Sequence, residues 1–306
     1  MSFPDYQVLL DETVRDYRHY GQDGKVATYI PELKKGDPRL AGVALMTPRG
    51  LFEAGDTRQS FTLQSISKVI SLLVALEERG MEAVFAKVGS EPTGDSFNSI
   101  VKLETSEQKP LNPMINAGAI AVCSLIPGSS VEERFSLITN LLEKILDRLV
   151  EIDEAVYKSE KETGHRNRAL AWFLKDINGL EGDVEEVLDL YFRQCSILVD
   201  CADLARIGMF LATKGITEAG IPLISAQSIR LATTFMVTCG MYNASGEFAI
   251  QVGIPAKSGV SGGILGVVPG RYGVATFGPA LDKKGNSVVG IRMLRHLSQV
   301  FDLSIF

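Results

Sequence analysis

The chain has 306 residues, of which 45% are hydrophobic and 22% are charged, and its formal net charge is −6. This composition is typical of a folded globular protein with a large apolar core, built as one large domain or two of ordinary size. The acidic balance, without a basic cluster, argues against nucleic acid as a partner. Because no apolar run is long enough to span a bilayer, we expect no membrane partner either.

Histidine and cysteine are too scattered to predict a metal site or a Ser-His-Asp triad. The three histidines are His19, His165 and His296, and the four cysteines are Cys123, Cys195, Cys201 and Cys239. No two cysteines form a Cys-x-x-Cys pair, so we expect reduced, mostly buried thiols. The first residues lack the pattern of a secretory leader, and we therefore expect a cytoplasmic protein. The scarcity of histidine favours lysine or tyrosine as a proton carrier.

The N-terminal part of the chain predicts a helix and then a β-hairpin. Apolar residues at helical spacing indicate an amphipathic helix over 5–20, which Gly21 ends. Apolar runs at 42–46 and 50–54 flank a turn signal with proline at its second position and glycine at its fourth. We interpret the two runs as adjacent antiparallel strands.

Ser-Ile-Ser-Lys at 65–68 begins a strongly apolar segment that continues to Leu76. On a helix, Ser65 and Lys68 lie one turn apart on the same face. If this helix is buried, Lys68 loses water, favours its neutral form and can activate a serine hydroxyl for acyl transfer. The alternative is an ordinary helix start, with Ser65 or Ser67 as its N-cap and the lysine in solvent.

The middle of the chain is helical in pattern. Two of its expected helices begin with a polar residue followed by glutamate three positions later, which is the spacing of a capping box. We expect helices from Ser130, with Glu133, to Leu149; from Asp183, with Glu186, to Leu198; and at about 201–213 and 225–238. Two further Ser-x-x-Lys matches, at 99–102 and 106–109, lack an apolar helical context.

The C-terminal part contains Lys257-Ser258-Gly259, which follows a strand-like run at 248–252. An early Ser-x-x-Lys with a late Lys-[Ser/Thr]-Gly is the order found in serine enzymes related to β-lactamases and penicillin-binding proteins. Apolar runs at 264–268 and 273–277 indicate two more strands, and a helix follows from Asn286-Ser287 to about residue 301.

Strands at both chain ends with helices between them predict one sheet interrupted by a helical insertion. We place the sheet part at about 21–64 plus 240–306 and the helical part at about 65–239. We see no flexible linker, and we expect residues 1–306 to form a single compact catalytic unit.

Several uncommon strings resemble the serine-dependent glutaminases of bacteria and mitochondria, in order from about residue 20 to 306. They are Gly24-Lys-Val-Ala-Thr-Tyr29-Ile-Pro-Glu-Leu33, Phe61-Thr-Leu-Gln-Ser65-Ile-Ser-Lys68, Asn112-Pro-Met-Ile-Asn116-Ala-Gly-Ala-Ile120, Ser159-Glu160, Arg166-Asn167-Arg-Ala-Leu-Ala171, Cys239-Gly-Met-Tyr242 and Pro255-Ala-Lys-Ser-Gly-Val260-Ser-Gly-Gly263. The resemblance implies an α+β, β-lactamase/transpeptidase-like fold, hydrolysis of L-glutamine to L-glutamate and ammonia, no metal or organic cofactor, and a homo-oligomer, often a tetramer.

The resemblance also implies a set of site residues. Ser65 is the implied nucleophile, and the backbone N–H groups of Ser65 and Val260 form the implied oxyanion hole. We hypothesise that Lys68 takes the serine proton, that Tyr242 helps to protonate the departing ammonia, and that Lys257 supports Lys68 by lowering its pKa. The implied substrate contacts are Tyr29, Ser65, Asn116, Glu160, Asn167, Tyr191, Tyr242 and Val260.

Three alternatives stay open at this point. A penicillin-recognising acyl-serine hydrolase shares both lysine motifs, although the Ser-Asp-Asn element of that class is absent from the sequence. A binding module for amino acids on the same fold would need no nucleophile, and a purely structural protein would need no pocket. Ammonia release from glutamine and turnover of nitrocefin distinguish these readings.

Overall fold

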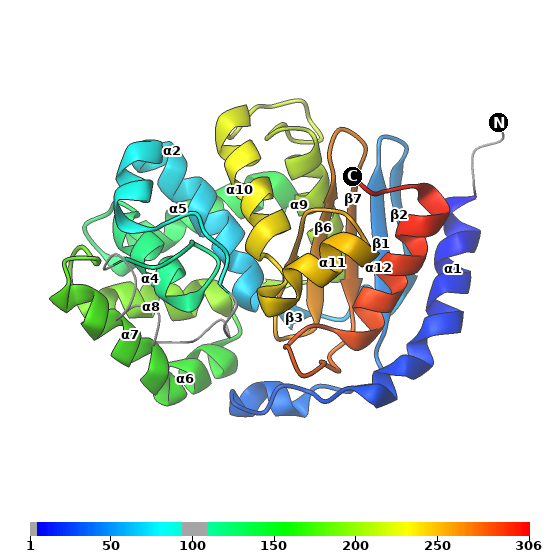
Figure 1. Cartoon of the computed structure of the whole chain (residues 1–306), viewed down its shortest axis with the longest axis horizontal. Helices are drawn as coiled ribbons and strands as arrows, with labels where there is room; N and C mark the ends of the chain where they lie inside the picture. Colours follow the sequence, from blue (N-terminus) through cyan, green and yellow to red (C-terminus); the bar gives the residue numbers. More distant parts are fainter. Residues whose placement is uncertain (1–4, 94–108) are drawn as a thin grey trace.

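The computed structural model describes residues 5–93 and 109–306 (Figure 1). The α-helices are α1 (Tyr6–Tyr17), α2 (Ser67–Lys87), α4 (Asn116–Leu125), α5 (Val131–Leu146), α6 (Glu154–Thr163), α7 (His165–Asp176), α8 (Val184–Cys195), α9 (Cys201–Ala212), α10 (Ala226–Cys239), α11 (Ser245–Gln251) and α12 (Val288–Phe301). The strands are β1 (Gly42–Thr47), β2 (Gly50–Gly55), β3 (Phe61–Thr62), β4 (Leu198–Val199), β5 (Ala256–Ser258), β6 (Gly263–Val268) and β7 (Tyr272–Phe277). Short 3-10 helices are η1 (Arg18–Asp23), η2 (Pro31–Lys35), η3 (Gln64–Ile66) and η4 (Tyr242–Ala244).

Five strands form one antiparallel sheet in the order β2-β1-β7-β6-β5. Leu45 of β1 pairs with Phe52 of β2 on one side and with Val274 of β7 on the other. The predicted hairpin and the two predicted C-terminal strands are therefore confirmed, and the sheet joins segments from both ends of the chain. A separate pair, β3 with β4, lies next to the segment that carries Ser65.

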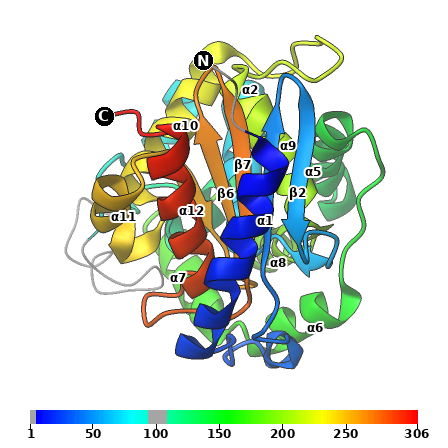
Figure 2. The same ribbon diagram turned by 90° about the vertical axis from the view of Figure 1, so that its right-hand side faces the viewer.

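Helices cover both faces of the sheet, which explains why β1, β6 and β7 are almost continuously apolar. Helix α9 packs on β1, β6 and β7. On the opposite face, α1 and α12 share a core with residues such as Val43, Ile264 and Val274, and Figure 2 shows these two helices in front of the strands. Helix α11 lies next to α12 on this face, and helices α2 and α4 to α8 form the second half of the molecule beside the sheet.

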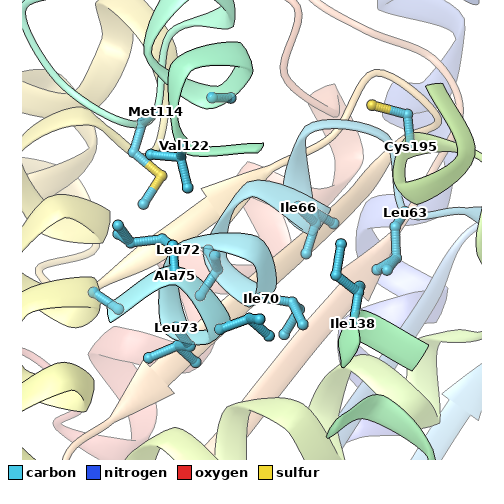
Figure 3. Packing of buried hydrophobic residues seen from close by; sticks show 14 of the residues in the cluster. Leu63, Ile66, Ile70, Leu72, Leu73, Ala75, Met114, Val122, Ile138 and Cys195 are labelled. Atoms are coloured by element: carbon cyan, nitrogen blue, oxygen red, sulfur yellow. The ribbon is translucent and has the colours of Figure 1, made fainter. Parts of the chain in front are cut away.

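Helix α2 is the centre of the larger core. Every residue from Ser67 to Leu76 is buried, as expected of a helix that is apolar on all sides (Figure 3). From Glu77 to Gly80 the residues of the helix are exposed. The helix bends at Gly80, whose φ of +79° suits glycine. The serine-lysine motif therefore stands at the deeply buried end of this helix.

The strand expected over 248–252 is wrong, because this run belongs to helix α11. A short apolar run does not distinguish a helix from a strand. Here only one side is buried: Phe248 enters the core, whereas Ile250 is 89% exposed. The strand that precedes the glycine loop is β5, which contains Lys257 itself.

Other boundaries also differ from the sequence expectations. Helix α5 ends at Leu146 because Asp147 adopts a left-handed conformation, which leaves Leu149 outside the helix. Helix α8 ends at Cys195, and Leu198 lies in β4 instead. The predicted N-terminal helix becomes a 3-10 helix from Arg18 and continues past Gly21.

The expected capping boxes form only in part. Ser130 accepts a hydrogen bond from Glu133 N at 3.2 Å, but the Glu133 carboxylate binds Ser129. Asp183 accepts from Glu186 N at 3.1 Å. A reciprocal box joins Asp200 and Asp203 at the start of α9. The predicted helices at about 201–213, 225–238 and from Ser287 are confirmed.

The two other Ser-x-x-Lys matches involve Ser99, Lys102 and Ser106, which lie outside the described residues. All four cysteines are free and buried, as predicted. Among residues 5–93 and 109–306, no helix combines the length and apolar character required to cross a membrane.

Candidate active site

Ser65 lies in η3, between strand β3 and helix α2, and is only 8% exposed. The neighbouring Gln64 has a φ of +50°, and Tyr242 has a φ of +56°. Left-handed conformations are unfavourable for such residues and persist only where the surrounding structure holds them. Ser65 thus has two strained neighbours: Gln64 precedes it in the chain, and Tyr242 is hydrogen-bonded to it.

The Tyr242 hydroxyl connects Ser65 to the edge strand of the sheet. It donates to the carbonyl oxygen of Ser258 at 3.0 Å and shares a hydrogen bond with the Ser65 side chain. Because the phenol hydrogen is directed at Ser258, the phenol oxygen is left to accept from the serine hydroxyl. Burial raises the pKa of Tyr242, and the bond to Ser65 opposes this only in part.

Lys68 is 1% exposed, and its amine binds two oxygen atoms. It donates to the carbonyl oxygen of Met114 at 3.2 Å and to Oδ1 of Asn116 at 2.7 Å. Burial lowers the pKa of Lys68 to about 8, although Cys195, Cys123 and Glu160 oppose the shift. A neutral amine has two hydrogens and one lone pair. With both hydrogens engaged, the lone pair of neutral Lys68 can accept a proton.

Lys257 is fully buried beneath Tyr242. Its Nζ donates to the carbonyl oxygens of Gly240 at 3.1 Å and Ser258 at 2.7 Å and lies 4.4 Å from the centre of the Tyr242 ring. Burial, followed by the charge of Lys68, lowers the pKa of Lys257 well below its ordinary value. Ser258 O therefore receives donors from both Lys257 and Tyr242.

Glu160 is a buried carboxyl group on α6, 6% exposed. Gln64 donates to its Oε1 at 2.7 Å and also contacts Thr62 Oγ1 at 3.2 Å. Burial raises the pKa of Glu160 to about 7, while Gln64 and the charge of Lys68 act in the opposite direction. A cation placed beside this carboxyl would restore its ordinary acidity.

Amide and phenol groups surround these charges. Asn116 Nδ2 donates to Asn167 Oδ1 at 3.0 Å, which joins α4 to α7. Burial raises the pKa of Tyr191 on α8, and Cys195 and Glu160 add to the shift. Tyr29 is 56% exposed as a residue, yet loss of water around its hydroxyl, with Tyr242 and Glu160 nearby, raises its pKa.

The glycine-rich loop after β5 approaches Ser65 closely. A Cβ atom on Gly259 would lie 2.7 Å from the carbonyl oxygen of Leu63, so a side chain does not fit there. Ser261 Oγ donates to Thr62 O at 2.6 Å and fixes the loop to β3. Val260 is 4% exposed and, with Tyr29, lines a neighbouring cavity of about 520 Å³.

Contacts or electrostatic coupling thus link the predicted site residues into one cluster. Sequence reasoning missed Gln64 and Cys195. Gln64 is adjacent to Ser65, but nothing in its local pattern predicts a contact with Glu160. Cys195 lies 4.0 Å from Ser67 Oγ, and burial raises the pKa of its thiol. Within the described part of the chain, no three His, Cys, Asp or Glu side chains gather as potential metal ligands.

The cluster thus contains a buried serine that is hydrogen-bonded to a phenol, and two lysines whose pKa values are lowered by burial. The glutaminase family model matches residues 24–306. The chain is 51% identical over 304 residues to a glutaminase from Alkaliphilus oremlandii, covering 98% of this chain and 100% of that protein. It is 51% identical over 302 residues to a glutaminase from Clostridium botulinum, covering 97% and 99%.

Solved structures give the same result. A Bacillus glutaminase crystallised with 4.3 M NaCl matches with a TM-score of 0.92 and 42% identity over 98% of this chain and 99% of that one. A Bacillus subtilis protein described as a probable glutaminase, complexed with 6-diazo-5-oxo-L-norleucine, matches with a TM-score of 0.91 and 40% identity, covering 100% and 98%. The chain belongs to the glutaminase family.

Proposed function

We propose that this protein hydrolyses L-glutamine to L-glutamate and ammonia through an acyl-enzyme on Ser65. The observation that carries the proposal concerns Ser65. It is buried, is hydrogen-bonded to Tyr242 and lies directly before the helix that presents Lys68. Attack on the side-chain amide would release ammonia and leave a γ-glutamyl ester, which water then hydrolyses. Splitting the reaction into two steps lowers the barrier for a stable amide.

Lys68 is the proposed base and Tyr242 the proposed relay. The hydrogen bonds of Lys68 to Met114 and Asn116 support this assignment because they leave the lone pair of the neutral amine available. Tyr242, in contact with Ser65, is suited to pass a proton to the departing nitrogen. Lys257 supports both groups through its contact with the Tyr242 ring and the charge repulsion between the lysines.

The remaining groups are proposed to bind the substrate. The backbone N–H groups of Ser65 and Val260 would stabilise the oxyanion, each contributing on the order of 3 kcal/mol. Glu160 would bind the α-ammonium. Asn167, Tyr191 and Tyr29 would bind the α-carboxylate, and Asn116 can serve either group.

A β-lactamase/transpeptidase-like fold is part of this proposal. It is supported by a Ser-x-x-Lys helix that meets an antiparallel sheet whose edge strand carries Lys-Ser-Gly. We also propose a cytoplasmic homotetramer with no cofactor. Four free buried thiols favour a reducing compartment. Light scattering of the purified protein tests the tetramer.

An ammonia-release assay on glutamine and asparagine, with wild type and Ser65→Ala, tests the function. We expect Ser65-dependent turnover of glutamine and none of nitrocefin. Turnover of nitrocefin instead of glutamine would favour the penicillin-recognising alternative. Binding of glutamine without ammonia release would favour a binding module.

The pH profile of kcat/KM tests the base. Because the pKa of Lys68 is about 8 and that of Glu160 about 7, activity should rise with pH through both values. In Lys68→Arg the guanidinium stays charged, so we expect a loss of activity and of the limb near pH 8. An unchanged profile in that variant would exclude Lys68 as the base.

A further inference from the structure

Tyr242 has a backbone conformation that an aromatic residue adopts only under constraint. Its φ of +56° lies in the left-handed region, which is unfavourable for bulky side chains. Six described residues other than glycine have a positive φ. Two of them, Gln64 and Tyr242, are the neighbours of Ser65, and the other four lie at helix ends, where a left-handed residue is common: Asp147, Asn178, Lys214 and Asp302. Because the backbone of Tyr242 decides where its ring points, whatever fixes this conformation also fixes the phenol at Ser65.

The segment that carries Tyr242 is attached to the edge strand β5 through Gly240. The carbonyl oxygen of Gly240 accepts from Ser258 N at 3.2 Å and from Lys257 Nζ at 3.1 Å. A Cβ on Gly240 would lie 1.8 Å from Ala256 O, so the backbone of this residue lies directly against the strand. These contacts set the position of the segment, and two side chains from other elements act on its conformation.

The hydroxyl of Ser245 bridges the backbone on either side of Tyr242. Ser245 is the first residue of α11 and is 7% exposed. Its Oγ accepts from Met241 N at 3.1 Å and donates to Tyr242 O at 2.9 Å. The backbone N–H of Ser245 also donates to Tyr242 O. The hydroxyl thus acts as both acceptor and donor within the same turn.

Asn286 binds the peptide group between Met241 and Tyr242 from the loop before α12. Its Nδ2 donates to Met241 O at 3.4 Å, and the same oxygen accepts from Ala244 N at 3.0 Å. Asn286 is fully buried, and its backbone exchanges hydrogen bonds with Asp282. Since the carbonyl groups of Met241 and Tyr242 are both bonded, the two planar peptide groups around the Tyr242 Cα are held, and with them φ and ψ.

We propose that Ser245 and Asn286 are positioning residues that hold Tyr242 in its left-handed conformation and so keep its hydroxyl at Ser65. The proposal rests on the role of Tyr242 given above, as the group that passes a proton to the departing nitrogen. Without the Ser245 hydroxyl, Met241 N loses its bond to Ser245 and Tyr242 O keeps only one of its two donors from that residue. The strained backbone can then relax, which turns the ring away from Ser65.

Ser245→Ala tests the proposal by kinetics and by its crystal structure. We expect kcat for glutamine to fall roughly tenfold to hundredfold with KM within about twofold, since the groups proposed to bind the α-ammonium and α-carboxylate lie on other elements. In the crystal structure of the variant, Tyr242 should have lost its positive φ and its bond to Ser65. Ser298→Ala is the matched control, with wild-type kinetics expected: Ser298 is also 7% exposed, and it donates to Val252 O at the other end of α11.

A double-variant cycle distinguishes positioning of Tyr242 from an effect on the fold. In a Tyr242→Phe background, Ser245→Ala should lower kcat by less than about twofold, because the hydroxyl that Ser245 positions is already absent. Asn286→Ala is a second, independent variant. We expect it to lower kcat roughly threefold to tenfold, since it loses one longer bond, and this effect should also disappear with Tyr242→Phe.

Three results would overturn the proposal: wild-type kcat in Ser245→Ala, an unmoved Tyr242 in the crystal structure of that variant, or equal falls in kcat with and without the Tyr242 hydroxyl. Absence of Ser65-dependent glutamine turnover in the wild type would instead defeat the proposed function, and wild-type kcat in Tyr242→Phe would defeat the proposed role of Tyr242. The crystal structure still decides the positioning in these two cases and where Tyr242→Phe has no measurable rate. If Ser245→Ala does not fold, the crystal structure of Asn286→Ala takes its place.

Discussion

Glu160 is the residue whose environment most clearly favours a cationic ligand. Its carboxyl is buried beside an amide, Gln64, and its pKa is raised to about 7. An α-ammonium at this position would replace the lost solvation and return the carboxyl to its charged form. Burial of the Glu160 carboxyl thus has two consequences. It favours a cationic ligand, and it makes the charged carboxylate unfavourable when no cation is bound.

Replacing Glu160 by glutamine should weaken binding and stabilise the fold. A raised carboxyl pKa means that the folded state holds a proton which the unfolded chain releases, so stability falls as pH rises from about 4.5 to about 7. Glu160→Gln removes this penalty, on the order of 3 kcal/mol above pH 7, while KM for glutamine rises steeply. Urea unfolding between pH 4 and 8, with initial rates, measures both effects.

The pH dependence of the unfolding free energy distinguishes removal of the buried charge from a general improvement in packing. The added stability of Glu160→Gln should vanish near pH 4, where both states of the wild type are protonated. A gain of equal size at every pH, or a variant with wild-type kinetics, would show that Glu160 is not the ammonium partner.

At the scale of elements, the short segments β5, the glycine loop after it and η3 set the position of the proposed catalytic groups. Gly259→Ala places a methyl group 2.7 Å from Leu63 O, so the loop must move away from Ser65. We expect kcat to fall roughly tenfold to hundredfold, with KM changed less, because the proposed oxyanion donor, the N–H of Val260, is displaced. Gly246→Ala is the matched control, since nothing lies within 4 Å of its added Cβ. Equal effects of both changes would contradict this view of the loop.

A carboxylate of α8, Asp189, binds two side chains of helix α6, which carries Glu160. Asp189 accepts hydrogen bonds from Tyr157 and Lys161 of α6 and from Arg193 Nε at 2.8 Å. We expect Asp189→Asn to raise KM for glutamine roughly threefold to tenfold with kcat within about twofold, since the proposed ammonium site at Glu160 shifts and the proposed nucleophile, Ser65, does not.

Asp189→Glu, which keeps the charge, should recover part of this loss. Glu154→Gln, an exposed change on α6, should have no effect. A fall in kcat without a change in KM would mean that Asp189 does not position the ammonium site.

Sequence periodicity predicted long elements better than short ones. The helices after Asp200 and Ser225 and the strands around Leu45, Leu265 and Ala275 follow from apolar spacing over many residues. Residues 248–252 do not, because the run is short and the spacing of Phe248, Ile250 and Val252 suits a helix or a strand. Only the burial of Phe248 and Val252, with the exposed Ile250 between them, shows the helix. Helix ends such as Asp147 depend on single left-handed residues that the pattern does not reveal.

At the scale of the whole molecule, the site is assembled from both halves of the chain. Ser65 and Lys68 were accessible to local motif reasoning, and Glu160, Asn167 and Tyr191 to family resemblance. The link from Gln64 to Glu160 spans 96 positions and depends on packing that no local pattern encodes. The main core includes α2, α4, α8 and α9 together with Ala44, Leu265 and Phe277 of the sheet.

Because this core is shared, we expect the two halves to unfold together. Trp172, the single tryptophan, lies on α7 in the helical half and is 57% exposed. Its fluorescence and far-ultraviolet circular dichroism should give coincident urea transitions. Two separated transitions would indicate independent domains.

Covalent labelling tests the central claim most directly. The enzyme is incubated with the glutamine analogue 6-diazo-5-oxo-L-norleucine, and the modified peptide is identified by mass spectrometry. We predict one adduct on Ser65, protection by glutamine, and neither adduct nor glutamine hydrolysis in Ser65→Ala. An adduct on Cys195 or another residue, with glutamine hydrolysis retained in Ser65→Ala, would contradict a serine acyl-enzyme.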